Sequence, residues 1–140
     1  AVLGASGGLG PKLREGDLQV PEGLYSVTLL NPNSRFHVSL RLGYPNQFDR
    51  RMALADGRDR LGGDVMIHGT ARSIGCLAIG NQAAEDLFVL AAWVGIDNMR
   101  VIISPTDFRG AHVQDPSVAV PWAGNLYAML RSELSNYQRP

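Results

Sequence analysis

The chain contains a single cysteine, Cys76, which lies eight residues after His68. A thiol near an imidazole can act as a nucleophile, because the histidine accepts the proton and the thiolate attacks a carbonyl carbon. Gly75 precedes the cysteine, and a glycine there allows a tight turn that presents the thiol and leaves backbone N–H groups free for an oxyanion. A lone cysteine is more often a small buried hydrophobic residue, and this stretch offers too few ligands for a metal site.

The residues around this pair have the pattern of two short strands. Val65, Met66 and Ile67 form an apolar run that leads into His68, a polar turn follows, and a second apolar step begins after Cys76. This order is typical of side chains that converge at the edge of a sheet.

Further strands are predicted on both sides of this segment. Residues 24–30 have strand composition, and the turn-forming residues 31–33 are predicted to close that strand. Residues 35–42 alternate between apolar and polar side chains, which indicates a strand with one buried face. The expected buried face comprises Phe36, Val38, Leu40 and Leu42. Another strand is predicted over residues 100–104, where Pro105 ends it.

Helical spacing of apolar residues predicts two helices, one that begins at a capping Asn81 and ends at Gly95, and one over residues 122–137. Residues 49–60 carry mixed charge and are expected to form a solvated loop or a short helix. The first 23 residues are rich in glycine and proline, so they are predicted to be loop that contributes little to the core.

The composition limits the classes of partner. With 140 residues the chain is long enough for one domain with a substantial core. Thirteen basic residues balance thirteen acidic ones, so no overall charge favours nucleic acid or an anionic membrane. No apolar run of about 18 residues is present, which excludes a membrane-spanning helix. The chain begins with Ala1 and no signal peptide is visible, so a targeting segment could have been removed.

Several motifs, in order along the chain, make it similar to one enzyme family. The chain resembles the catalytic domain of L,D-transpeptidases, the YkuD-like enzymes that cross-link peptidoglycan, and in particular their murein transpeptidase or amidase branch. The matching segments are Gly16-Asp17 with Pro21-Glu22-Gly23-Leu24-Tyr25, His37-Val38-Ser39-Leu40, Tyr44-Pro45-Asn46 with Asp49-Arg50, Ile67-His68-Gly69, Ser73-Ile74-Gly75-Cys76, and Asp107-Phe108-Arg109.

The resemblance implies a fold and a set of catalytic roles. The implied fold is mainly β, a sandwich or barrel-like sheet with about two packed helices, in a single domain over residues 1–140 that lacks the family's first strands. Cys76 would be the nucleophile and His68 its base, with the backbone carbonyl of Gly69 orienting the imidazole. The N–H groups of Gly75 and Cys76 would hold the oxyanion, and Ser73 would support the turn or the site.

Substrate-binding roles follow from the same resemblance and from the chemistry of the substrate. Arg72 is a candidate clamp for substrate carboxylates, although it could also be a solvated loop charge. His37, Tyr44 and Asn46 could line the cleft, and each could instead have a structural role, with turn formation the alternative for Asn46. Ile74 replaces a histidine that is common in the family, so His68 would act without a second imidazole.

The implied reaction is acyl transfer between peptidoglycan stem peptides through a thioester on Cys76, with no cofactor and no metal. The alternatives are a hydrolase that uses the same site, either an L,D-carboxypeptidase or an amidase, and a non-catalytic peptidoglycan-binding module. The expected partners are peptidoglycan stem peptides, with no nucleic acid and no membrane span, and the oligomeric state is open. By resemblance the location is periplasmic or otherwise outside the cytoplasm.

Overall fold

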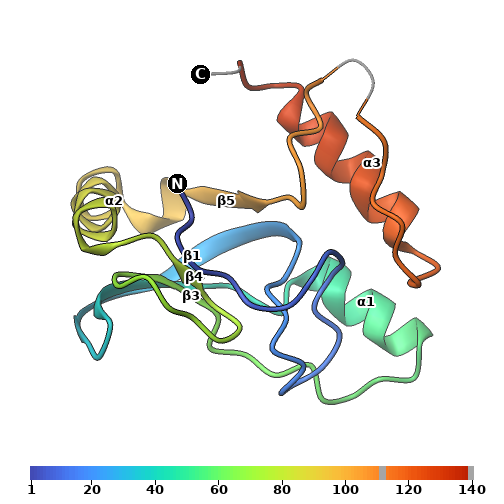
Figure 1. Ribbon diagram of the computed structural model, residues 1–140, viewed down its shortest axis with the longest axis horizontal. Helices are drawn as coiled ribbons and strands as arrows, with labels where there is room; N and C mark the ends of the chain where they lie inside the picture. Colours follow the sequence, from blue (N-terminus) through green and yellow to red (C-terminus); the bar gives the residue numbers. More distant parts are fainter. Residues whose placement is uncertain (111–112, 139–140) are drawn as a thin grey trace.

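The computed structural model describes residues 1–110 and 113–138, and its centre is a curled sheet of five strands (Figure 1). The spatial order of the strands is β4-β3-β2-β1-β5, and each adjacent pair is antiparallel except β3 and β4, which are parallel. The strands are β1 (Gly23–Ser34), β2 (His37–Leu42), β3 (Met66–His68), β4 (Leu77–Ala78) and β5 (Arg100–Ile103).

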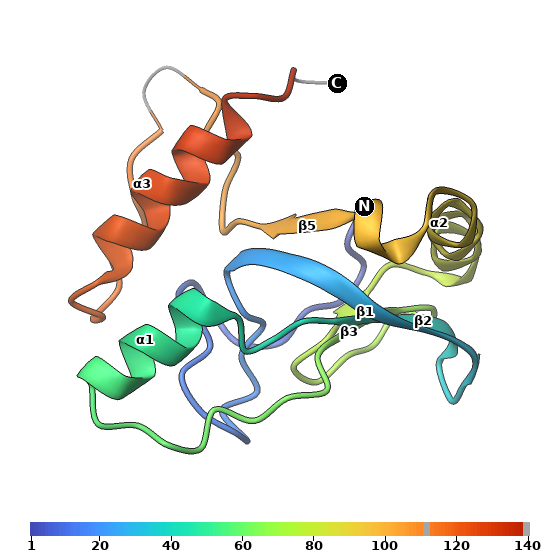
Figure 2. The same ribbon diagram turned by 180° about the vertical axis from the view of Figure 1, so that it is seen from behind.

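Three helices flank the sheet, and both ribbon views place α2 at one end and α1 and α3 at the other (Figures 1 and 2). They are α1 (Gln47–Ala55), α2 (Asn81–Val94) and α3 (Ala123–Leu134), and the short 3₁₀ helix η1 (Ile96–Asn98) leads into β5. The expected mainly β fold is confirmed. The third helix is α1, which forms part of the segment that was expected to be a loop or a short helix.

The strand that was predicted to close at residues 31–33 continues to Ser34, so this prediction is wrong. The reason is the pairing of β1. Its first four residues pair with β5, while its second half pairs only with β2. Pro32 lacks an N–H, and a strand segment with one free edge tolerates that loss.

The prediction of one buried face for β2 is only partly confirmed. Leu40 and Leu42 are buried as predicted, but Ser39 on the opposite face is also buried and Phe36 lies outside the strand, half exposed. Because β2 lies between β1 and β3, its register places Ser39 opposite His68. Ser39 is therefore buried beside the strand that carries the histidine, while His37 and Arg41 on the same polar face are exposed.

Helix α2 has the predicted bounds, and Gly95 ends it by donating its N–H to Ala91. The predicted cap is wrong, because Gly80 occupies the N-cap position and no side chain caps the helix. The Asn81 side chain instead accepts the N–H of Thr70 at 2.8 Å, in the turn that follows β3. This asparagine joins the helix to the loop of the candidate site.

The N-terminal loop contributes more to the interior than its composition indicated, so that prediction is wrong as well. Val20, Lys12 and Glu22 are all buried, and Gly4 forms a bridge with Ala78 of β4. The N-terminal loop thus contributes buried residues and pairs with β4, the strand at one edge of the sheet.

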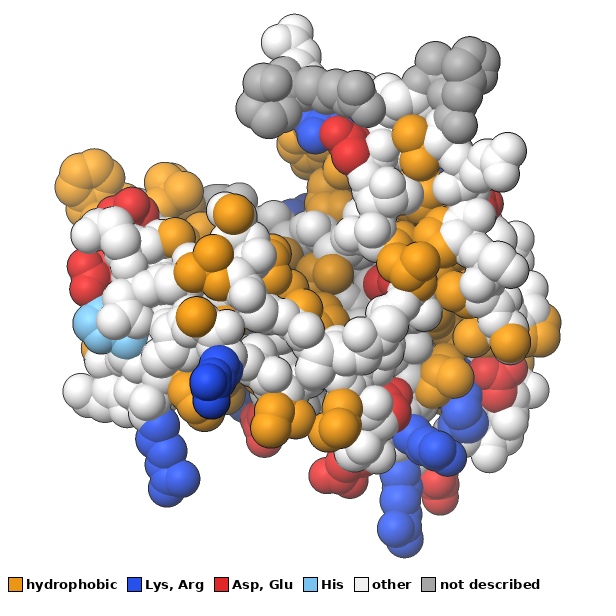
Figure 3. Space-filling model, viewed as in Figure 1, with side chains coloured by type: hydrophobic (Ala, Val, Ile, Leu, Met, Phe, Trp, Pro, Cys, Tyr) orange, Lys and Arg blue, Asp and Glu red, His pale blue; other side chains and the backbone are white. Residues whose placement is uncertain are grey.

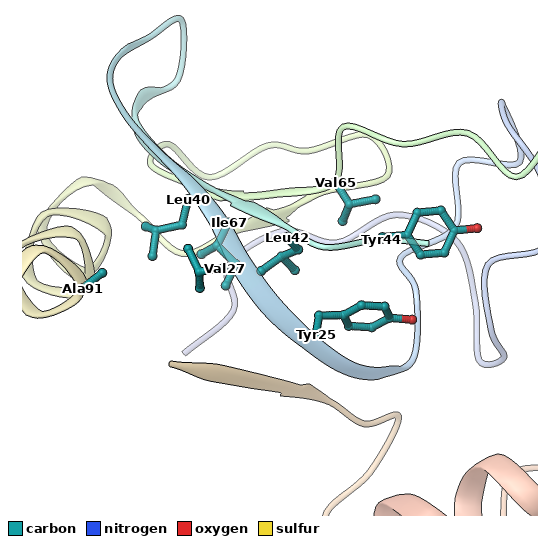
Figure 4. Packing of buried hydrophobic residues seen from close by; sticks show 8 residues of the cluster. All are labelled: Tyr25, Val27, Leu40, Leu42, Tyr44, Val65, Ile67 and Ala91. Atoms are coloured by element: carbon teal, nitrogen blue, oxygen red, sulfur yellow. The ribbon is translucent and has the colours of Figure 1, made fainter. Parts of the chain in front are cut away.

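Two apolar clusters form the core. The first packs side chains of β1, β2 and β3 against Ala91 of α2, as Figure 4 shows. The second lies under α3 and includes Phe108, Trp122 and Tyr127. On the face shown in Figure 3, basic and acidic side chains are interspersed, in agreement with the net charge of zero.

Candidate active site

His68 is the last residue of β3 and is only 2% exposed. Its Nδ1 lies 2.6 Å from the carbonyl oxygen of Gly69. A carbonyl oxygen can only accept a hydrogen bond, so Nδ1 carries the proton and the neutral ring keeps its lone pair on Nε2. The predicted orienting contact is present, and it fixes the tautomer that a general base needs.

The space around Gly69 is too small for a side chain. A Cβ at this position would lie 2.7 Å from the carbonyl oxygen of Phe36 and 2.7 Å from Oδ1 of Asn81. The residue is therefore held between the start of β2 and the start of α2, which fixes its carbonyl toward the imidazole. The aromatic ring of Phe36 also packs on the His68 ring, with the two centroids 4.7 Å apart.

Cys76 lies at the end of a turn in which Gly75 has a φ of +79°. The backbone N–H of Cys76 donates to Oγ of Ser73 at 3.1 Å, and the same hydroxyl lies 3.3 Å from Nε2 of His68. Since Nε2 holds the lone pair, the Ser73 hydroxyl donates to it. Ser73 thus connects the base to the backbone of the nucleophile.

The Cys76 thiol donates to the carbonyl oxygen of Asp64 at 3.7 Å, while Nε2 of His68 is bound to Ser73. Burial raises the pKa of the Cys76 thiol, and the charge of Asp64 raises it further. A backbone hydrogen bond with Met66 and the charge of Lys12 oppose this rise in pKa. The net effect is a raised pKa, which favours the neutral thiol over the thiolate.

Both backbone groups that were predicted to hold an oxyanion already have a partner. The N–H of Cys76 is bound by Ser73, and the N–H of Gly75 donates to Oγ of Ser6 at 2.5 Å. An oxyanion can use either group only after a serine hydroxyl has moved.

Two cavities meet at the nucleophile and share only Cys76 and Ile74. The first has a volume of about 540 Å³, and His68 and Arg72 contribute to its wall. The second has a volume of about 270 Å³ and is lined by charged residues that include Lys12. The thiol is therefore accessible from two separate hollows. The complete lining of the first is Gly4, Ala5, Phe36, His68, Ala71, Arg72, Ser73, Ile74 and Cys76.

The predicted substrate-binding residues lie in different places. Arg72 is exposed on the wall of the first cavity and makes no ion pair within the described residues.

The ring of His37 pairs with Glu85 of α2 and does not line either cavity. Tyr44 is buried and donates its hydroxyl to Leu61 at 3.1 Å. Asn46 caps α1. The structure thus brings only Arg72 to the thiol, and the other three have structural contacts.

Sequence reasoning missed four residues of this site, namely Ser6, Phe36, Asp64 and Lys12. Three of them lie more than ten residues from the Cys76 turn in the chain, and Asp64 directly precedes the apolar run that begins at Val65. No local motif marks them. The pairing of the N-terminal loop with β4 brings in Ser6, and the packing of the β1–β2 connection brings in Phe36. Asp64 appears as the acceptor of the thiol, and Lys12 in the wall of the second cavity.

No group of three or more histidine, cysteine, aspartate or glutamate side chains that could hold a metal ion occurs among residues 1–110 and 113–138. Within the same ranges, each helix is too short or too polar to cross a membrane.

Known proteins show similarity to this chain at the level of sequence and of fold. The family model for the YkuD L,D-transpeptidase catalytic domain matches residues 2–103. A protein of Escherichia coli K12 named "Putative L,D-transpeptidase YafK" is 42% identical over 114 residues, which cover 78% of this chain and 44% of that protein. The chain therefore spans less than half the length of this curated relative.

Two solved structures share the fold. The helical cell shape determining protein Pgp2 of Campylobacter jejuni superposes with a TM-score of 0.54 at 18% identity, over 96% of this chain and 59% of Pgp2. A mutant of Pgp2 gives a TM-score of 0.55 at 20% identity, over 94% of this chain and 43% of the mutant chain. The family model covers well over half of the chain and the sequence relative agrees with it, so this chain belongs to the YkuD family of L,D-transpeptidase catalytic domains.

Proposed function

We propose that this domain is a cysteine acyltransferase that acts on peptidoglycan stem peptides through a thioester on Cys76. One observation carries the proposal. His68 has its proton fixed on Nδ1 by Gly69, and its basic Nε2 faces the turn that presents the only thiol of the chain. A base with a fixed tautomer next to a nucleophile is the arrangement that covalent catalysis requires.

The first step is the activation of the thiol. Burial raises the pKa of Cys76, which favours the protonated thiol as the starting state. The thiol rotates from Asp64 toward His68 and replaces the Ser73 hydroxyl at Nε2, which then takes the thiol proton. The resulting imidazolium stabilises the thiolate, and the Gly69 carbonyl continues to accept the Nδ1–H bond.

The second step forms the acyl-enzyme. The thiolate adds to the carbonyl carbon of the third residue of a tetrapeptide stem, and the carbonyl oxygen becomes an oxyanion. When this intermediate collapses, the C–N bond to the terminal D-alanine breaks and His68 returns its proton to the leaving amine. The stem is then attached to Cys76 as a thioester, and the histidine is again neutral.

The third step transfers the acyl group. The amine of a second stem attacks the thioester and gives a proton to His68, so that an amide forms and the C–S bond breaks. His68 then returns this proton to the leaving sulfur, which regenerates the thiol and the neutral histidine. The two cavities that meet at Cys76 support transfer, because a donor and an acceptor need separate approaches to one atom. Water in place of the amine would give the hydrolase, a carboxypeptidase or amidase, with the same residues.

One cationic side chain supports a substrate that carries carboxylates. Arg72 lies on the wall of the first cavity, whereas Lys12 on the wall of the second is already paired with Asp17 at 2.6 Å. A guanidinium binds a carboxylate through two parallel hydrogen bonds, and Arg72 has no competing ion pair within the described residues. Because peptidoglycan lies outside the cytoplasmic membrane, the proposed site of action is extracytoplasmic.

Mass spectrometry of purified muropeptides after incubation with the protein tests this proposal. We expect cross-linked dimers from the unmutated domain and none from Cys76→Ala. Ser132→Ala is the matched control, because it removes an exposed hydroxyl from α3, away from both cavities. Shortened or released products without dimers would favour the hydrolase. Binding to sacculi without any turnover, unchanged in His68→Ala, would favour the non-catalytic module.

A further inference from the structure

The loop before β1 approaches the nucleophile turn from a distant part of the chain. Gly4 pairs with Ala78, whose N–H donates to the Gly4 carbonyl oxygen at 2.9 Å. The Ala78 carbonyl accepts the N–H of Leu3 at 2.8 Å in return. This pairing fixes the N-terminal loop on β4, two residues after Cys76, and brings Ser6 beside the turn.

The hydroxyl of Ser6 makes two hydrogen bonds there. Its Oγ accepts the N–H of Gly75 at 2.5 Å and donates to the carbonyl oxygen of Leu18 at 2.5 Å. Gly75 has a positive φ, and no atom lies within 4 Å of the place where a Cβ would be. The hydrogen bond that the Gly75 N–H donates to Ser6 therefore orients an amide with open space on its side-chain face.

We infer that Ser6 is a positioning residue for the nucleophile Cys76, an inference that rests on the proposed function. The N-terminal loop holds the turn on both sides of the thiol, through Ser6 at Gly75 and through Gly4 at Ala78. Reaction rates depend steeply on the placement of the attacking atom, so a loosened turn slows acylation without weakening substrate binding.

The same contacts assign the oxyanion to one of the two candidate amides. To free the Gly75 N–H, the Ser6 hydroxyl would have to leave both Gly75 and Leu18. To free the Cys76 N–H, the Ser73 hydroxyl must leave Cys76 and Nε2 of His68, and the proposed activation step already displaces it from Nε2. The Cys76 N–H therefore receives the oxyanion, while the Gly75 N–H remains bound to Ser6.

The test compares Ser6→Ala, Ser6→Thr and the control Ser132→Ala. Amide hydrogen exchange at Gly75, measured by NMR on the resting protein, reports the bond without any substrate. Steady-state kinetics with a tetrapeptide stem gives kcat and KM separately, and thermal unfolding shows whether each variant is folded.

For Ser6→Ala we expect exchange at Gly75 to accelerate and kcat to fall, each by about tenfold, the size of effect that loss of one hydrogen bond produces, with KM little changed. Ser6→Thr keeps a hydroxyl and is expected to restore both values. The inference is overturned if exchange at Gly75 is unchanged in Ser6→Ala. It is equally overturned if exchange accelerates while kcat is unchanged or higher, since Ser6 would then only occupy the place of the oxyanion.

The exchange measurement also separates this inference from the proposed function. If the unmutated domain turns over no stem peptide, the proposed function fails. The rate of Cys76 alkylation by iodoacetamide then takes the place of kcat as the measure of how the thiol is positioned. Ser6→Ala is then expected to change that rate together with the exchange at Gly75. An unchanged alkylation rate would overturn the positioning role.

Discussion

The Nε2 atom of His68 lies 3.3 Å from Oγ of Ser73, and this serine, not the cysteine, occupies the basic position of the imidazole in the resting state. The same hydroxyl accepts the N–H of Cys76. Ser73 therefore holds both the base and the candidate oxyanion donor until a substrate enters.

The first prediction concerns this hydroxyl. Ser73→Ala removes the hydrogen bond that orients the base and the one that orients the Cys76 backbone, so we expect kcat/KM to fall by about tenfold. Ser73→Thr keeps a hydroxyl and should retain most of the activity. Kinetics with a tetrapeptide stem measures both variants. Full activity of Ser73→Ala would show that His68 and Cys76 are positioned without it.

The second prediction concerns the protonation of Cys76. Because burial raises the pKa of the thiol, its alkylation rate should rise with pH through an inflection above the value of an ordinary cysteine. Lys12 opposes that shift, so Lys12→Met should move the inflection to still higher pH. Iodoacetamide kinetics across a pH series measures this directly.

Lys12→Arg is the matched control for the charge, since it keeps a cation at the same place. It should leave the inflection close to that of the unmutated protein. An inflection that is equal in all three proteins would mean that the Lys12 charge does not reach the sulfur.

The third prediction concerns the glycine that orients the base. In Gly69→Ala the new Cβ would meet the Phe36 carbonyl and the Asn81 side chain, both at 2.7 Å. We expect a loss of about 1 to 3 kcal/mol in the free energy of unfolding, the usual cost of overpacking, together with a large loss of activity. Denaturant unfolding measures the stability.

The control for this change is Gly8→Ala, because a Cβ on Gly8 has no atom within 4 Å and this glycine does not have a positive φ. Its free energy of unfolding should stay within about 0.5 kcal/mol of the unmutated value. Equal stability of the two variants would mean that the backbone near Gly69 relaxes without cost.

Sequence patterns predicted the candidate site best where its residues lie close together in the chain. The apolar run that ends in His68, the turn and Cys76 are close in the chain, so strand and turn patterns were sufficient to predict that they converge. The structure brings His68, Ser73 and Cys76 together within this one segment. The α2 helix that follows was also predictable, because its apolar spacing extends over several turns.

The remainder of the site depends on contacts that no local pattern encodes. Ser6 reaches Gly75 across 69 residues of chain, and it does so because Gly4 pairs with Ala78. A glycine-rich loop has no periodicity from which such pairing could be read. The buried face of β2 was only partly predicted for a similar reason, since alternation shows which side chains share a face but not what packs against each face.

The fourth prediction concerns a buried carboxyl outside the site. Burial raises the pKa of Asp49 to about 6, although hydrogen bonds from Asn46 and Tyr25 lower it. In the unfolded chain the value is near 3.8, so between about pH 4 and pH 6 the folded state holds a proton that the unfolded state lacks. The contribution of Asp49 to stability is therefore largest below pH 4 and is lost as the pH rises through about 6.

Asp49→Asn should remove this dependence, because the amide is always neutral and its oxygen can still accept the Asn46 N–H of the α1 capping box. Relative to the unmutated protein, we expect the variant to gain about 2 to 3 kcal/mol of stability between pH 4 and pH 7. Asp59→Asn, at an exposed position, is the control and should show no such gain. Urea unfolding at a series of pH values gives the difference directly, and a constant difference between Asp49→Asn and the unmutated protein would show that the carboxyl is ionised in both states.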